Sequence, residues 1–168
     1  MVPVTILTLI ASSAPAPSII VLQPQEKQVR PGRERIVPIW IGTVEAINLG
    51  MALESQRYER PSTHDLFLDA VTSLDATVDH VFIDRVKDKT FFAKLVLSQH
   101  GRLIQLDARP SDALALAVRQ QAPLYIDEHV LDTASYPYIY KEPFDEEQAV
   151  SDFHDFLEHI TPDDFRDE

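Results

Sequence analysis

Three runs of β-branched and apolar residues near the start of the chain predict β-strands. They are V-P-V-T-I-L-T-L-I at 2–10, S-I-I-V-L-Q at 18–23 and R-I-V-P-I-W-I-G at 35–42. Such residues fit a pleated, half-buried surface better than a helix. The polar stretch 24–34, which contains Pro31 and Gly32, predicts a turn before the third strand.

Two helices follow, each with an expected N-terminal cap. Thr43 is the expected N-cap of the first, which runs to Glu54 and carries Glu45 in its first turn. Ser62 or Thr63 is expected to cap the second. The apolar stripe of the second helix consists of Phe67, Ala70, Val71 and Leu74.

The middle of the chain predicts a β-meander. Strand patterns at 78–86, 90–97 and 102–108 are separated by short turns at 87–89 and around Gly101. A very apolar helix then begins at Pro110, and a short strand at 123–126 and a turn of helix at 128–132 follow it. Because hairpin and crossover connections both occur, we expect an α+β fold with a mixed or antiparallel sheet.

The C-terminal segment differs from the rest in charge. Residues 1–136 hold 13 Lys and Arg against 16 Asp and Glu, whereas residues 137–168 hold 2 against 11. Apolar residues at helical spacing predict one amphipathic helix at 146–160, with acids on its other face. We therefore expect one domain at 1–136 and an acidic extension at 137–168. The apolar stripe of this helix needs a cover, so we also expect a homo-oligomer.

Composition narrows the class of protein. The net charge of −12 argues against a nucleic-acid binder with a broad basic face, although local basic patches remain possible in the nearly neutral body. The absence of cysteine excludes disulfides and thiolate chemistry. No Lys or Arg precedes Lys27, and no apolar run is long enough to cross a membrane. We expect a cytoplasmic protein without a membrane partner.

The stretch D-A-R-P-S-D-A at 107–113 is the strongest candidate site. Pro110, Ser111 and Asp112 suit a helix start, and that is one sufficient reason for them. It does not explain Asp107 and Arg109. Two acids, one arginine and the free amides of a helix start also suit a phosphate site.

Two further segments carry candidate chemistry. His64 and Asp65 stand at a predicted helix start, where a histidine can serve as general acid or base, or can simply lie in a capping turn. Glu45 stands in another first turn, where capping is again an alternative. No HExxH, Walker or GxGxxG motif occurs, nor the (D/E)-x-K half of a common metal-dependent nuclease signature.

Four segments carry a resemblance to a known family. They occur in this order: P-I-W-I-G-T-V-E-A at 38–46, T-H-D-L at 63–66, D-A-R-P-S-D-A-L-A-L-A-V-R at 107–119 and A-P-L-Y-I-D-E-H-V-L at 122–131. They resemble the bifunctional nuclease (BFN) family over roughly residues 2–134. The closing F-L-E-H-I-T-P-D-D-F also resembles the ending of actinobacterial members.

The resemblance implies a nuclease, because the family is named for plant members associated with DNase and RNase activity. The polar motif positions kept here are Glu45, His64, Asp65, Asp107, Arg109, Ser111 and Asp112. In this interpretation Arg109 and first-turn amides hold a phosphate of DNA or RNA. Either His64 is the general base, or Glu45, Asp107 and Asp112 hold Mg²⁺ or Mn²⁺. Asp65 either orients His64 or serves the metal.

A second interpretation stays open. The chain is then a non-enzymatic binding or regulatory module, supported by its acidity and by the missing nuclease signatures. The motif would be a helix-start junction, with Arg109 paired to Asp107 or Asp112 as a buried latch.

Overall fold

The computed structural model describes residues 1–13, 15–25, 34–56 and 58–138. The chain divides into two compact units, of which the first holds residues 1–28 and 35–136 and the second residues 29–34 and 137–168. Most of the predicted turn at 24–34 and the whole predicted helix at 146–160 lie outside the described residues. The proposed division at residue 136, like the homo-oligomer, stays a prediction. All four helices and the candidate site belong to the first unit.

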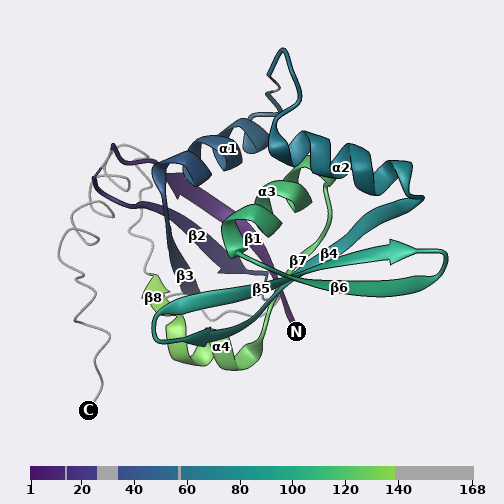
Figure 1. Ribbon diagram of the computed structural model, residues 1–168. Helices are drawn as coiled ribbons and strands as arrows, with labels where there is room; N and C mark the ends of the chain where they lie inside the picture. The colour runs from purple at the N-terminus through teal and green to yellow at the C-terminus, as the bar shows by residue number, and fades with distance from the viewer. Residues whose placement is uncertain (14, 26–33, 57, 139–168) are drawn as a thin grey trace. The chain divides into compact units, whose positions relative to one another are not determined.

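An eight-stranded mixed sheet forms the framework (Figure 1). Its strands are β1 (Val2–Ile10), β2 (Ser18–Pro24), β3 (Glu34–Ile41), β4 (Ala76–Lys87), β5 (Thr90–Gln99), β6 (Arg102–Ala108), β7 (Leu124–Ile126) and β8 (Tyr136–Tyr138). Their order is β6-β5-β4-β7-β1-β2-β3-β8. The meander β4–β5–β6 is antiparallel, and β7 pairs in parallel with β4. The α+β class and the meander are confirmed, and β8 was not predicted.

Four helices accompany the sheet. They are α1 (Thr43–Leu53), α2 (Thr63–Ser73), α3 (Pro110–Gln120) and α4 (Glu128–Ala134). Figure 1 shows α1, α2 and α3 gathered on one side of the strands, with α4 away from them. No helix among the described residues is both long and apolar enough to cross a membrane.

Helix α3 is the centre of the core. Its residues Ala113 to Ala117 are all buried, and α3 packs against α1, α2, β4 and β5. Three alanines in this run leave room for a neighbouring helix to approach closely, while Leu114 and Leu116 fill the space toward the other elements. The apolar composition of the helix therefore follows from burial, as the sequence indicated.

Two strand-to-helix junctions and one capped helix start meet near α3. Strand β3 enters α1 through Gly42, which is the N-cap, so the prediction of Thr43 as the cap was wrong by one residue. Strand β6 enters α3 through Arg109. Ser62, one of the two caps predicted, is the N-cap of α2, and it forms a capping box with Asp65. These three starts position the polar residues of the candidate site.

Candidate functional site

Arg109 links the start of α3 to the start of α1. Its Nη1 donates to Oε1 of Glu45 at 2.8 Å, across 64 positions of sequence. Its Nε and Nη2 donate to the two carboxylate oxygens of Asp112 at 2.8 and 3.2 Å. Arg109 is extended because Pro110 follows it, and this geometry directs the side chain across the helix start. The two carboxylates, Asp112 first, raise the pKa of Arg109 above its usual value, so the guanidinium stays charged.

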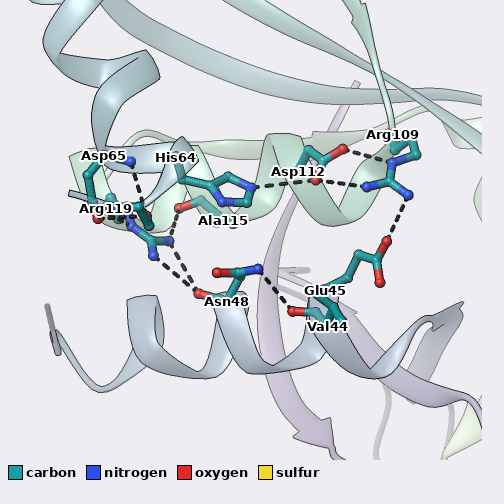
Figure 2. Close-up of polar contacts among 10 residues, drawn as sticks. Val44, Glu45, Asn48, His64, Asp65, Arg109, Asp112, Ala115 and Arg119 are labelled. Carbon is teal, nitrogen blue, oxygen red and sulfur yellow. Dashed lines mark hydrogen bonds and ion pairs between the residues drawn. The ribbon is translucent and has the colours of Figure 1, made fainter. Parts of the chain in front are cut away.

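Asp112 extends this network to α2. Its Oδ1 lies 3.4 Å from Nε2 of His64. Figure 2 shows the resulting row of side chains, which runs from His64 through Asp112 and Arg109 to Glu45. Residues from three separate segments, all predicted as site candidates, thus stand in continuous contact.

The network faces an open pocket of about 1060 Å³. Glu45, His64, Arg109 and Asp112 all line it, and so does Asp107. The side chain of His64 is only 15% exposed, whereas that of Arg109 is 65% exposed. A partly buried histidine oriented by a carboxylate, beside an accessible guanidinium, is an arrangement that can transfer protons and bind an anion.

Asp65 contacts Ser62 and Arg119, whereas its neighbour His64 contacts Asp112. Its carboxylate accepts hydrogen bonds from the backbone and hydroxyl of Ser62, and its Oδ1 lies 3.1 Å from Nε of Arg119. The Ser62 hydroxyl, and then the Ser62 amide and Arg119, lower the pKa of Asp65 against the opposing effect of burial. Asp65 lines a different, smaller pocket. Its contacts are those of a group that fixes the start of α2.

Arg119 is the polar residue that the sequence analysis missed. Only 11% exposed, it donates to Asp65, to the carbonyl oxygen of Asn48 on α1 at 3.3 Å, and to that of Ala115 at 3.1 Å. A signal was present in the sequence, because Arg119 stands seven residues after Asp112. That spacing puts both on one face of α3.

Two predicted residues stand apart from the network. Ser111 is buried and lines a neighbouring pocket beside Gly42 and Thr90. Asp107 lies opposite Lys94 in the pairing of β5 with β6, whereas Leu106 lies opposite Leu95. Because directly paired residues share a sheet face and successive residues alternate, the side chain of Asp107 belongs to the face of Lys94.

Comparison with known proteins identifies the family. The bifunctional nuclease domain model matches residues 20–138. An uncharacterized protein of Mycobacterium tuberculosis is 38% identical over 157 residues, which cover 86% of this chain and 92% of that protein. The chain belongs to the bifunctional nuclease domain family. The resemblance found in the sequence is thereby confirmed.

Plant members of the family are more distant. Bifunctional nuclease 2 of Oryza sativa subsp. japonica is 27% identical over 120 residues, and bifunctional nuclease 1 of Arabidopsis thaliana is 25% identical over 120 residues. Each alignment covers 70% of this chain but only 35% of the plant protein.

In this BFN domain the three predicted metal ligands are not arranged as a metal site. Glu45 and Asp112 are both bridged by Arg109, and Asp107 belongs to the sheet face of Lys94. Among the described residues no three His, Asp or Glu side chains are placed to hold a metal ion. As they stand, these residues do not fit Mg²⁺ or Mn²⁺, whose involvement stays a prediction.

The latch interpretation of the BFN motif needs a correction. Arg109 pairs with Asp112, one of its two expected partners, but its side chain is exposed rather than buried, and it also pairs with Glu45. The arginine that ties the helices together is the partly buried Arg119.

Proposed function

We propose that this chain is a nuclease that hydrolyses phosphodiester bonds of DNA or RNA in the pocket lined by His64, Arg109 and Asp112. The single observation that carries the proposal is the continuous contact of His64, Asp112, Arg109 and Glu45 along one pocket. Membership of the bifunctional nuclease domain family, and the plant relatives that are named bifunctional nucleases, support the reaction class.

Arg109 is the phosphate-binding residue in this proposal. An arginine carries five N–H groups, and three nitrogens of Arg109 each use one on Asp112 or Glu45. Two N–H groups therefore remain for phosphate oxygens, on a side chain that is accessible from solvent. The amides of Ser111 and Asp112 in the first turn of α3 add donors and the positive end of a helix dipole.

His64 is the general base. Asp112 at Nε2 orients the ring, which leaves Nδ1 as the nitrogen that accepts a proton in this proposal. A water oxygen forms the new bond to phosphorus while its proton passes to Nδ1. The bond from phosphorus to the leaving oxygen breaks, and that oxygen takes up a proton from solvent water, while His64 afterwards releases its proton to solvent. Glu45 holds Arg109 in place and touches no reacting atom.

A binding module is the second candidate. The observation in its favour is that Arg109 and Arg119 already bond the predicted site acids, so these contacts also serve as ties between helices. Under this alternative, removal of His64 or Arg109 changes no chemical rate, because the chain cleaves nothing.

A cleavage assay separates the two candidates. Purified protein is incubated with single- and double-stranded DNA and RNA, in the presence of Mg²⁺, Mn²⁺ or chelator. His64→Ala is compared with His129→Ala, which removes an exposed histidine of α4 outside the pocket. We expect cleavage that His64→Ala abolishes and His129→Ala preserves. Cleavage that chelator removes would assign the chemistry to a metal ion, and absence of cleavage on all substrates would favour the binding module.

A further inference from the structure

The pocket has an apolar wall that the proposed chemistry does not use. Phe67 follows His64 by one helical turn on α2, and Leu116 follows Asp112 by one turn on α3. Leu95 and Leu106, directly paired on β5 and β6, complete the wall from the sheet. The pocket lining is therefore polar along the network and apolar at Phe67, Leu95, Leu106 and Leu116.

The charges of the pocket limit the kind of nucleic acid that it can accept. Four acidic residues line it, against two arginines: the acids are Glu45, Glu59, Asp107 and Asp112, and the arginines are Arg60 and Arg109. A surface that follows a phosphate backbone needs a row of Lys or Arg, one for each neutralised phosphate. This pocket has cations for one or two phosphates only.

We propose that the pocket binds one unpaired nucleotide, with its phosphate at Arg109 and its base against the apolar wall of Phe67, Leu95, Leu106 and Leu116. The pocket, at about 1060 Å³, matches the upper size of sites that enclose small organic ligands. A base can reach this wall only when it is not paired and stacked in a duplex, and a base that stacks on an aromatic ring needs no particular sequence. The inference rests on the proposed nuclease function and specifies its substrate as single-stranded nucleic acid or an unpaired end.

Binding of small probes to the full chain tests this inference without cleavage. Isothermal titration calorimetry compares adenosine 5′-monophosphate with ribose 5-phosphate, which carries the same phosphate without the base. We expect the nucleotide to bind at least about ten-fold tighter, because only its base contacts the apolar wall. Equal affinity for the two probes would overturn the inference.

Variants locate the effect in the pocket. Phe67→Ala should remove most of the preference for the nucleotide over ribose 5-phosphate. Arg109→Ala should weaken the binding of both probes by a similar factor. Leu103→Ala is the matched control, because Leu103 is an exposed leucine of β6 that does not line the pocket. If Phe67→Ala does not fold, Leu106→Ala is the alternative. Leu106 belongs to the same wall, and its side chain on β6 is partly exposed, so its removal disturbs the core less. A preference unchanged in every folded wall variant would also overturn the inference.

Salt dependence gives an independent test with single-stranded oligonucleotides. Neutralisation of one or two phosphates predicts that log K falls against log salt with a slope of about −0.7 to −1.4. A slope steeper than about −3, with duplex bound as tightly as single strand, would contradict a single-nucleotide pocket.

The outcomes also separate this inference from the proposed function. If the nucleotide binds but no substrate is cleaved, the proposed nuclease function is rejected. If single- and double-stranded substrates are cleaved equally and the nucleotide binds no tighter than ribose 5-phosphate, only the inference is rejected.

Discussion

Arg119 and Asp65 join the last turn of α3 to the first turn of α2, with Nε and Oδ1 3.1 Å apart. The same guanidinium donates to the carbonyl oxygen of Asn48, so one side chain ties three helices together. Because His64 directly precedes Asp65, this tie also determines where His64 stands relative to Asp112. Asp65, which ties the helices together, and His64, which belongs to the candidate site, are thus consecutive residues at the start of α2.

We expect Asp65→Asn to lower the free energy of unfolding at pH 7 by about 1–3 kcal/mol, since it weakens a helix cap and removes a charge partner of Arg119. The folded-state pKa of Asp65 is lowered, so its stabilisation is complete above the unfolded pKa near ~3.9 and is lost as pH falls through the folded value. Urea unfolding between pH 7 and pH 3 should show the difference from wild type shrinking below about pH 4.

The control for this prediction is Asp69→Asn on the exposed side of the same helix. Its unfolding free energy should stay within about 0.5 kcal/mol of wild type at each pH. A difference between Asp65→Asn and wild type that is constant over the whole pH range would show that the carboxylate charge is not responsible.

Arg109, which precedes α3, and Arg119, in its last turn, should behave in opposite ways when replaced by alanine. Arg119→Ala leaves a partly buried Asp65 without its charge partner and should cost about 2 kcal/mol of stability. Arg109→Ala removes two ion pairs of an exposed side chain and should cost less than about 1 kcal/mol, while cleavage is lost. Chemical denaturation and a cleavage assay on the same samples check both. A large stability loss in Arg109→Ala would revive the latch interpretation.

Glycine at position 42 keeps Glu45 in contact with Arg109. A Cβ added there would collide with the Glu45 carboxylate, although the backbone at Gly42, with φ −73°, tolerates alanine. We expect Gly42→Ala to displace Glu45 and to reduce the cleavage rate several-fold, with a stability loss of up to about 1 kcal/mol because alanine is a poorer N-cap than glycine. Gly50→Ala on the same helix meets only ordinary packing contact, and should keep the rate and gain up to about 1 kcal/mol. Equal rates in both variants would rule out a role for Glu45.

Local sequence patterns were sufficient to predict most of the fold. Alternation and turn residues predicted the meander, and the Ser62 cap and the start of α3 at Pro110 follow from local chemistry. Strand β8 was not predicted, because its three residues carry little local pattern and its strand form depends on pairing within the sheet.

The site was predictable in its residue types but not in its contacts. The sequence marked Glu45, His64, Arg109 and Asp112, and their meeting depends on how three helices pack, which no local pattern states. Asp65 and Arg119 illustrate the difficulty. Both belong to the motifs, yet only the packed structure shows that they bind each other rather than face the pocket.

The most direct test of the proposed catalytic unit is a double-mutant cycle on the cleavage rate. Single-stranded substrate is cleaved by wild type, His64→Ala, Asp112→Asn and the double variant, each checked for folding by circular dichroism. If Asp112 acts by orienting His64, the loss in Asp112→Asn should largely disappear when His64 is already absent, so the double variant should resemble His64→Ala. Rates that fall independently and multiply in the double variant, or that survive in all three, would contradict a His64–Asp112 catalytic unit.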